Sequence, residues 1–435
     1  MTNPWYARLC EIAVDRPDAV AWADDTRCCS YREWAALVTA RAEDFTAAAG
    51  RPVVIQDVDP YRQWRDWLAA QAAGAIPVLF HATLSAADGQ RLCHMHGLDN
   101  APTMPRPAGV DFGVLSSGST GLPKLFWRRS SSWIDFFPIQ NPLFALHSNS
   151  RLFFHGSLSF TGNLNACASV FWEGGALITT TRKRPDAWWQ TITARQVNAM
   201  YLLPVKLRHL VHAAAASYPP LESLFAGSQA LDRELVRDLQ QCFPQATCTL
   251  YYGAGELNFI TYCRLDEWQQ NPGIVGRPFD GVRVRIADDG KIHVTTPYGV
   301  CGTEDETTLG DLGEWTDDGM IRFLGRCDDV INCAGHKCSL SHIESVLRAT
   351  PAVRDIAVFA VPDPLRGEIP IAAFVSDTAD AGEMRRIATV LPAVERPRRW
   401  IRYDELPLTD CSKVDYRLLR RRHTQEKRRI SKKTN

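Results

Sequence analysis

A short loop rich in glycine and hydroxyl side chains has the residue types best suited to chemistry on a charged ligand. Residues 115–124 read Leu-Ser-Ser-Gly-Ser-Thr-Gly-Leu-Pro-Lys. Glycines let a backbone approach a ligand with its N–H groups facing anionic oxygens, while hydroxyl groups and a lysine add donors and positive charge. The segment therefore predicts a polyphosphate-binding loop. Its candidate ligand-binding residues are Ser116, Ser117, Gly118, Ser119, Thr120, Gly121 and Lys124.

The spacing of this loop separates it from the P-loop of nucleoside triphosphatases, which needs Gly-x-x-x-x-Gly-Lys-Ser/Thr. Only two residues lie between Gly118 and Gly121, and Pro123 precedes Lys124. Taken alone, such a serine- and glycine-rich segment also fits a flexible linker. The rest of the chain must decide between a ligand-binding loop and a linker.

Four further segments follow the loop. They are residues 251–256 (Tyr-Tyr-Gly-Ala-Gly-Glu), residues 310–313 (Gly-Asp-Leu-Gly), residues 325–337, which begin Gly-Arg-Cys-Asp-Asp, and residues 406–417, which contain Ser-Lys-Val-Asp. With the loop they resemble the ordered motifs of the AMP-forming acyl- and aryl-activating enzymes: acyl-CoA synthetases, nonribosomal adenylation domains and firefly luciferase. The resemblance covers nearly the whole chain, and five motifs in the same order are hard to produce by chance.

The resemblance implies a ligase that activates an apolar or aromatic carboxylic acid in two steps. ATP converts the acid to an acyl-adenylate with release of pyrophosphate, and the acyl group then moves to a phosphopantetheine thiol. That thiol belongs to coenzyme A or to a free-standing acyl carrier protein, supplied in trans. Because a carboxylate and a triphosphate repel each other, a lysine and a Mg²⁺ ion are sensible means of bringing them together. The implied cofactors are ATP, Mg²⁺, and coenzyme A or the phosphopantetheine of a carrier protein.

Each predicted site residue matches a position in these motifs. The resemblance gives catalytic roles to Lys413, which bridges the carboxylate and the α-phosphate, and to Glu256, which carries Mg²⁺. It assigns Asp328 to a hinge between two domains and Gly335 to a thiol tunnel. A tyrosine or arginine in such motifs is otherwise commonly a core or surface residue. Adenine or ribose contacts are expected from Gly227, Ser228, Gln229, Tyr252, Gly253, Asp311 and Arg326.

Residues 156–164 lie where the resembling family builds its acid pocket. This segment lacks the aspartate that pairs with an α-ammonium group in members that activate amino acids, so an amino acid substrate is disfavoured. An apolar or aromatic acid fits better, with Phe160, Asn163 and Gly227 as the expected lining. The same residues are equally compatible with a protein core.

Departures from the family pattern leave other functions open. Gly255 stands where the family usually carries threonine, and Ser412 replaces the usual glycine before the lysine. One alternative is a catalytically weakened protein that binds nucleotide or acyl ligand and serves as a partner. Another is an adenylate-forming enzyme with a non-thiol acceptor, as luciferases are. The enzyme hypothesis is favoured because the charged groups are retained at Lys124, Glu256, Asp311 and Lys413.

Alternating helical and strand patterns must position these groups. They predict strands at residues 52–55, 76–80 and 247–251 and a helix at 61–73, which indicates an α/β fold. Strand 247–251 delivers the Gly253 turn to a strand end, where ligands of open α/β sheets gather. The expected architecture is a large N-terminal domain of β-sheets layered with helices, residues 1–326, and a small mobile α+β domain, residues 327–419.

Two further predictions concern the C-terminal part of the chain. Ser341 with Glu344 predicts a capping box that opens a short helix, so Glu344 is interpreted as a cap and not as a catalytic residue. Residues 420–435 are strongly basic and predict a disordered tail, with docking of an acidic carrier protein or an anionic surface as the alternative.

Composition indicates a soluble globular enzyme with no nucleic-acid partner. The 435 residues are 45% hydrophobic and 23% charged, with zero formal net charge. No apolar run approaches the roughly twenty residues of a membrane helix, and the N-terminus lacks a signal-peptide pattern, so a cytoplasmic location is expected. The thirteen cysteines are scattered without paired spacing, which predicts reduced thiols and not a disulfide scaffold or a metal site.

Overall fold

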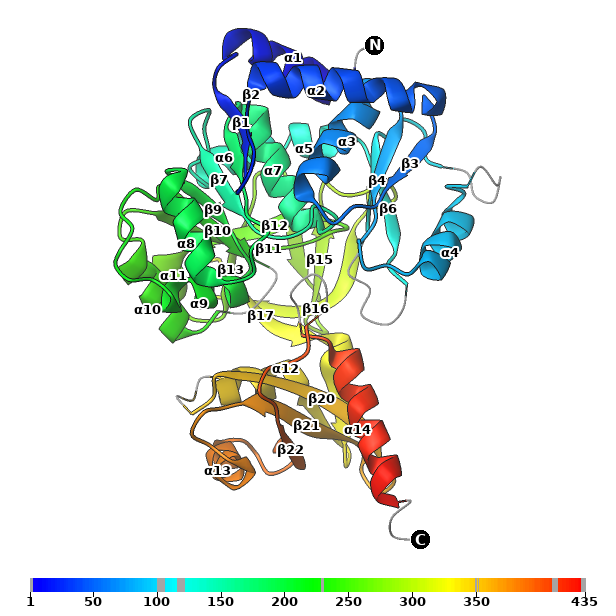
Figure 1. Ribbon diagram of the computed structural model, residues 1–435. Coiled ribbons are helices and arrows are strands. Elements are labelled where there is room, and N and C mark those ends of the chain that lie inside the picture. Colours follow the sequence, from blue (N-terminus) through cyan, green and yellow to red (C-terminus); the bar gives the residue numbers. More distant parts are fainter. Residues whose placement is uncertain are drawn as a thin grey trace. The chain divides into compact units, whose positions relative to one another are not determined.

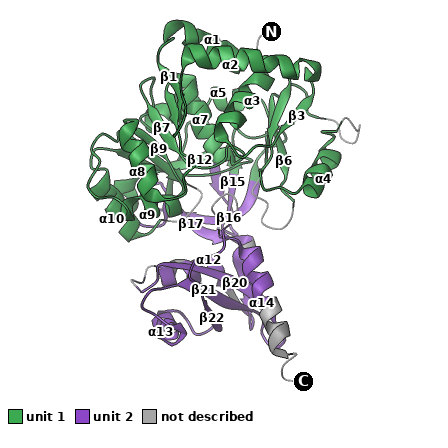
Figure 2. Ribbon diagram, in the orientation of Figure 1, with its two compact units in different colours: residues 1–271, 275–283, 294–307 green, residues 272–274, 284–293, 308–435 purple. Residues whose placement is uncertain are grey.

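The computed structural model describes residues 3–99, 106–115, 122–227, 231–348, 350, 352–408 and 414–431. The chain forms two compact units, coloured separately in Figure 2. Unit 1 consists of Met1–Asn271, Val275–Arg283 and Val294–Thr307. Unit 2 consists of Pro272–Ile274, Val284–His293 and Thr308–Asn435.

The larger sheet of unit 1 is mostly parallel. Its strand order is β13-β12-β11-β10-β9-β7-β8-β1-β2 (Figure 1). Strands β11, β10, β9, β7, β8 and β1 pair in parallel, whereas β2, β12 and β13 pair antiparallel to their neighbours. The predicted strand at 247–251 is confirmed as part of β11. The bounds are β1 Val20–Ala23, β2 Cys28–Ser30, β7 Arg151–Phe154, β8 Ala176–Ile178, β9 Ala199–Tyr201, β10 Ser223–Gly227, β11 Thr247–Ala254, β12 Asn258–Arg264 and β13 Ile274–Pro278.

A second, four-stranded sheet of unit 1 has the order β3-β4-β5-β6. Strands β3, β4 and β5 are parallel, and β6 returns antiparallel to β5. The predicted strands at 52–55 and 76–80 are confirmed as β3 and β4. The bounds are β3 Pro52–Ile55, β4 Ile76–Leu79, β5 Phe112–Leu115 and β6 Leu125–Arg128.

Helices cover these sheets, and local signals fix where several of them begin. Ser30 forms a capping box with Glu33 at the start of α2, and the predicted helix at 61–73 is confirmed as α3, which Asp59 caps. The bounds are α1 Pro4–Asp15, α2 Tyr31–Ala42, η1 Glu43–Ala48, α3 Pro60–Ala72, α4 Ala86–His96, α5 Ser131–Ile134, α6 Phe137–Leu143, α7 Thr161–Glu173, α8 Pro185–Ala194, α9 Pro204–His212, α10 Arg233–Cys242 and α11 Leu265–Gln270.

Tryptophan packing fixes the second sheet against the first helices. The ring of Trp5 on α1 meets the edge of Trp67 on α3 at a centroid distance of 5.3 Å, and Trp67 meets Phe112 on β5 at 5.5 Å. The indole N–H of Trp5 donates to the hydroxyl of Ser130, 2.8 Å away. Edge-to-face aromatic pairs of this kind add to the stabilisation from burial alone. The start of β5, the strand that leads to the predicted phosphate loop, is therefore packed in an aromatic core.

Unit 2 is an α+β unit. Helix α12 packs against β20, and its buried residues Ile343 and Leu347 join a core that includes Phe359 and Phe374. The bounds are β14 Arg283–Ile286, β15 Lys291–Thr295, β16 Thr307–Trp315, β17 Ile321–Arg326, η2 Cys327–Asp329, β18 Val330–Cys333, β19 His336–Ser339, α12 Leu340–Arg348, β20 Asp355–Asp363, β21 Gly367–Val375, α13 Ala381–Ile387, η3 Ala388–Val390, β22 Arg399–Arg402 and α14 Tyr416–Ser431. The domain boundary after residue 326 stays a prediction.

The predicted capping box at Ser341 is wrong. Helix α12 begins at Leu340, and it is the Ser339 hydroxyl that accepts a hydrogen bond from the backbone N–H of His342. The Glu344 carboxylate instead accepts from the backbone N–H of Val358 at 2.9 Å and from the hydroxyl of Tyr416 at 2.7 Å. Burial, with the carboxylate beside it, raises the pKa of Tyr416 well above its usual value. Glu344 therefore links α12 to β20 and α14, so the interpretation of a structural role holds but the cap does not.

A helix occupies most of the segment predicted to be a disordered tail. Helix α14 continues to Ser431, beyond the expected start of the tail at residue 420. Leu419 and His423 are buried, and the His423 ring lies 6.2 Å from that of Phe359 on β20. Residues four apart share one helix face, so these two anchor the helix while the arginines between them face solvent. The prediction of disorder rested on the basic composition, which gives no sign of this narrow buried face.

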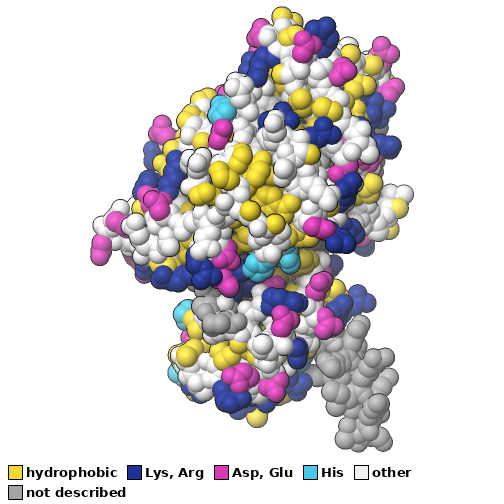
Figure 3. Space-filling model, turned by 60° about the vertical axis from the view of Figure 1, so that its left-hand side comes forward, with side chains coloured by type: hydrophobic (Ala, Val, Ile, Leu, Met, Phe, Trp, Pro, Cys, Tyr) yellow, Lys and Arg dark blue, Asp and Glu magenta, His cyan; other side chains and the backbone are white. Residues whose placement is uncertain are grey.

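Hydrophobic side chains gather on the face of unit 1 drawn in Figure 3, with charged residues of both signs around them.

No helix within the described parts of the chain is long and apolar enough to cross a membrane. The cysteines that the structure describes are all free thiols.

Candidate active site

The carboxyl ends of three neighbouring parallel strands place the predicted adenine-binding residues. Strand β10 pairs with β9 on one side and β11 on the other, so that Phe225 lies beside Tyr201 and Gly227 beside Tyr251. Tyr252 follows on β11 and is half-buried. Ligands of open α/β sheets bind at such strand ends. The structure thus brings Gly227 and Tyr252 to one edge of the sheet, and Ser228 and Gln229 lie outside the described residues.

Glycine is required at Gly227 by contact with the next strand. A Cβ there would lie 2.6 Å from both the ring and the carbonyl oxygen of Tyr251. No side chain fits in that space. At Gly253 a Cβ would overlap the carbonyl oxygen of Asn258, which opens β12 in the left-handed conformation with φ of 64°. Both glycines are therefore explained by close backbone packing, whether or not a nucleotide lies above them.

Glu256 lies in the turn between β11 and β12, and buried groups hold the backbone of this turn. The carbonyl oxygen of Glu256 accepts from the backbone N–H of Val300 at 2.8 Å. The guanidinium of Arg128 donates to the carbonyl oxygen of Gly255 at 2.7 Å. A half-buried carboxylate on a turn fixed from two sides can present its oxygens in a defined direction. This is what a Mg²⁺ ligand needs.

Arg128 is a supporting residue that the motifs did not reveal. Its guanidinium also donates to the carbonyl oxygen of Tyr298 at 3.0 Å and to the hydroxyl of Ser132 at 3.1 Å. Burial lowers the pKa of Arg128 to about 9, which still leaves it charged at neutral pH. An arginine at the end of an apolar strand is usually exposed, so no sequence signal singled out Arg128.

The predicted phosphate loop joins two paired strands. Leu115 at the end of β5 lies opposite Leu125 at the start of β6, and the exposed Lys124 stands directly before β6. The hydroxyl of Thr161, the first residue of α7, donates to the carbonyl oxygen of Leu115 at 3.4 Å. The base of the loop therefore meets the first turn of α7. The remaining predicted residues, Ser116, Ser117, Gly118, Ser119, Thr120 and Gly121, lie outside the described residues.

The predicted acid segment forms the approach to α7. Phe160 precedes this helix, and buried Asn163 donates its side-chain N–H to the carbonyl oxygen of Ser157 at 2.9 Å. The ring of His155 is tilted against that of Trp188 at a centroid distance of 4.4 Å, and burial, with nearby Lys206, lowers the pKa of His155 to about 4. His155 is therefore neutral at pH 7. Asn163 shapes the turn through a local hydrogen bond.

Unit 2 brings the two predicted ribose-binding residues together. Asp311 on β16 lies opposite Arg326 on β17, and their side chains form an ion pair of 3.2 Å between Oδ1 and Nε. The guanidinium also donates to the carbonyl oxygen of Leu309 at 2.9 Å. Asp311 is only 8% exposed. The carboxylate is thus oriented by its partner, as a group that accepts hydrogen bonds from two vicinal hydroxyls must be.

The predicted hinge and thiol-tunnel residues follow in unit 2. Asp328 lies in the short helix η2, directly after β17. Gly335 has a φ of 86° in the tight turn between β18 and β19, and its N–H donates to the side-chain oxygen of Asn332 at 2.9 Å. Turn geometry alone accounts for this glycine. Lys413 lies outside the described residues, in a segment whose flanks pair as a bridge between Leu408 and Val414.

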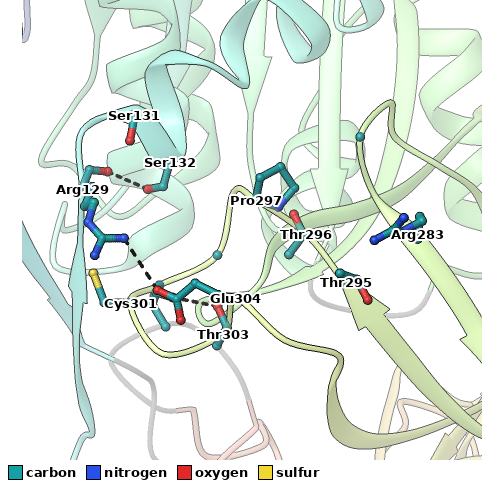
Figure 4. A pocket seen from close by; sticks show the side chains of 13 residues that line it. Arg129, Ser131, Ser132, Arg283, Thr295, Thr296, Pro297, Cys301, Thr303 and Glu304 are labelled. Atoms are coloured by element: carbon teal, nitrogen blue, oxygen red, sulfur yellow. Dashed lines mark hydrogen bonds and ion pairs between the residues drawn. The ribbon is translucent and has the colours of Figure 1, made fainter. Parts of the chain in front are cut away.

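Unit 1 contains a cavity of about 520 Å³ (Figure 4). Its lining includes Arg129, whose guanidinium pairs with Glu304 at 3.6 Å, and the hydroxyl of Ser132. None of the predicted site residues lines it. Its loop nevertheless carries Val300, which bonds the Glu256 turn, so the cavity wall belongs to the support of the candidate site.

Comparison with known proteins matches both parts of the chain. A family model described as AMP-binding enzyme matches residues 100–300, and one described as AMP-binding enzyme C-terminal domain matches residues 342–413. The chain is 27% identical over 333 residues to an uncharacterized acyl-CoA ligase, YhfT, of Bacillus subtilis (strain 168), covering 73% of this chain and 69% of that protein. It is 30% identical over 396 residues to triostin synthetase I of Streptomyces triostinicus, covering 80% of this chain and 72% of that protein.

A solved structure shares the fold. The o-succinylbenzoate coenzyme A synthetase of Bacillus subtilis, in complex with ATP and magnesium ion, superimposes with a TM-score of 0.83 at 18% identity, covering 95% of this chain and 99% of that one. The two-part α/β architecture expected from the sequence is thereby confirmed. Together with the matched family models and relatives, this places the chain in the AMP-binding enzyme family, as an AMP-forming ligase that activates a carboxylic acid as its acyl-adenylate.

Proposed function

We propose that this ligase activates an apolar or aromatic carboxylic acid and transfers the acyl group to the thiol of coenzyme A or of a carrier protein in trans. One observation carries the proposal. The first turn of α7 bonds Leu115 at the base of the phosphate loop, and it lies in the segment expected to line the acid pocket. The loop base and the acid segment therefore meet within unit 1, as a reaction between a phosphate and a carboxylate requires.

The residues present fit a Mg²⁺ ion carried by the nucleotide. No group of three or more His, Cys, Asp or Glu side chains that could enclose a metal occurs among the described residues. Mg²⁺ in nucleotide enzymes is commonly held by one or two carboxylates together with phosphate oxygens and water. Glu256, on its fixed turn, supplies such a carboxylate. The ion would neutralise phosphate charge, while Lys124 and the hydroxyls of the loop would hold the phosphates in place.

We assign the other nucleotide contacts to Tyr252 and Asp311. Tyr252 offers an aromatic ring to the adenine at the edge of the β11 strand, and the Asp311 carboxylate would accept the ribose hydroxyls. We assign to Lys413 the stabilisation of the negative charge that develops between the carboxylate and the α-phosphate. The hinge at Asp328 and the tunnel glycine Gly335 would then serve thioester formation after Lys413 has left the site.

Exchange of labelled pyrophosphate into ATP tests the proposal directly. With the full-length protein and Mg²⁺, we expect exchange that depends on an aryl or apolar acid and is absent with amino acids. Adding coenzyme A, or a carrier protein bearing phosphopantetheine, then identifies the acceptor as the one that forms a thioester. If none of the acids in the panel supports exchange, the enzyme hypothesis is contradicted and the nucleotide-binding partner protein is favoured.

Gly255 is the observation that keeps the weakened-enzyme alternative open. It has no positive φ, and no atom lies within 4 Å of the position its Cβ would take. A Cβ therefore fits there without rearrangement. We expect Gly255→Thr to raise the exchange rate roughly tenfold, since a hydrogen bond to a charged group contributes about 1.5–3 kcal/mol. Gly255→Val is the matched control, because valine has the shape of threonine without the hydroxyl. An equal rise in both variants would argue against a missing hydroxyl.

A further inference from the structure

Two tyrosines from separate interior strands of the larger sheet meet above the strand between them. Tyr201 ends β9 and Tyr251 lies on β11, with β10 between them. Their hydroxyl oxygens are 2.8 Å apart, and their rings are stacked at 6.4 Å between centroids. Because Gly227 on β10 has no side chain, the ring of Tyr251 can lie across that strand and reach Tyr201. The meeting of the two side chains is therefore specified by three strands together.

The pair also faces the first turn of α7. A Cβ at Gly162 would overlap the hydroxyl oxygen of Tyr201 and would lie 2.9 Å from the ring of Phe160. The helix thus packs directly against the phenol at this point. The neighbouring residue, Thr161, bonds Leu115 at the base of the phosphate loop. With consecutive Cα atoms 3.8 Å apart, the Tyr201 hydroxyl lies on the order of 10 Å from the loop base.

Behind the two tyrosines there is aromatic core. The ring of Tyr251 stacks on Phe259 at 3.9 Å, and that of Tyr201 stacks on Phe225 at 5.2 Å. Phe225 is fully buried, and Tyr201 is 0% and Tyr251 7% exposed. Interiors are packed to crystal-like density, so a ligand can pass this point only if a ring moves away.

We propose that Tyr201 and Tyr251 form the closed end of the acid pocket and limit the substrate to a short acid, of one aromatic ring or similar length. This inference rests on the proposed function, which puts the substrate carboxylate at the phosphate loop. The ring of Tyr251 lies against Gly227 of the expected adenine site, and the Tyr201 hydroxyl lies against Gly162, between Phe160 and Asn163 of the expected acid lining in the sequence. An acid that starts near the loop reaches the two hydroxyls after about one ring. Long-chain fatty acids are therefore excluded, which narrows the substrate class.

The experiment compares acids of two lengths in the exchange assay with the full-length protein. Benzoate and hexanoate represent short acids, and 4-phenylbenzoate and dodecanoate represent long ones. For the natural sequence we expect kcat/KM to be at least tenfold higher for the short acid of each pair. In Tyr251→Ala the ring is removed, and we expect the long-to-short ratio of kcat/KM to rise tenfold or more, since even one methylene in an apolar pocket changes discrimination by about 10- to 200-fold.

Tyr251→Phe is the matched control, because it keeps the ring and removes only the hydroxyl. Its length preference should match that of the natural sequence, whatever the hydroxyl contributes to the rate. If Tyr251→Ala does not fold, the unsubstituted protein still tests the inference. Exchange that is as fast with dodecanoate as with hexanoate would show that the two tyrosines do not close the pocket. An unchanged ratio in a folded Tyr251→Ala would also overturn the inference. Exchange with short and long acids alike rejects only this inference, whereas no exchange with any acid rejects the proposed function as well.

Discussion

Replacing Lys413 with alanine is expected to slow acyl-adenylate formation by about a hundred- to a thousandfold. The reason is electrostatic: the substrate carboxylate and the α-phosphate repel each other, and the lysine would oppose the negative charge that develops between them. Removing one preorganised group of this kind costs about 2.7–4 kcal/mol of transition-state stabilisation. The flanks of the Lys413 segment are held by the bridge between Leu408 and Val414, so the substitution should leave unit 2 folded.

Two rates measured on the same variant make this prediction specific. Pyrophosphate exchange reports the first step and should fall, whereas thioester formation from a preformed acyl-adenylate bypasses it and should stay within a fewfold of the natural rate. Lys427→Ala, which removes a lysine from the basic helix α14, is the control and should affect neither step. An equal loss in both steps for Lys413→Ala would indicate a general structural defect and contradict the assigned role.

Replacing Arg128 with methionine is expected to lower the free energy of unfolding by about 2–4 kcal/mol. The substitution removes hydrogen bonds to Ser132 and to the carbonyl oxygens of Gly255 and Tyr298. A buried carbonyl left without a partner costs about 1–3 kcal/mol. Removing the buried charge offsets part of this loss, because burial disfavours the charged form and lowers the pKa of Arg128 to about 9. Because the Gly255 carbonyl is freed, the turn that carries Glu256 should also move and the exchange rate should fall.

The adjacent arginine provides the control. Arg129 is exposed and pairs with Glu304 at the rim of the cavity, so Arg129→Met should change stability by less than about 1 kcal/mol. Urea denaturation followed by tryptophan fluorescence measures both variants. Equal stability of Arg128→Met and Arg129→Met would show that the three buried hydrogen bonds do not stabilise the turn.

Elements with a strong local pattern were predictable. The strands at 52–55 and 76–80 form β3 and β4, because short apolar runs between helices bury well in a parallel sheet. The cap of α12 was predicted two residues too late, since Ser339 and Ser341 are both good caps and the helix uses Ser339. The helix at 420–431 was missed because two buried residues among many arginines give no clear periodic signal.

The sequence by itself determined the family and the chemical groups of the site, because a phosphate-binding loop, a glycine turn and a capped helix are specified by residues close together in the chain. Only the tertiary structure decided which distant side chains support those groups. Arg128 reaches a carbonyl 127 residues away, and the Tyr201 and Tyr251 hydroxyls come from positions 50 residues apart. Such contacts depend on strand order and register, which place a side chain on one face or the other. Local sequence patterns do not show which distant strands pair or in which register.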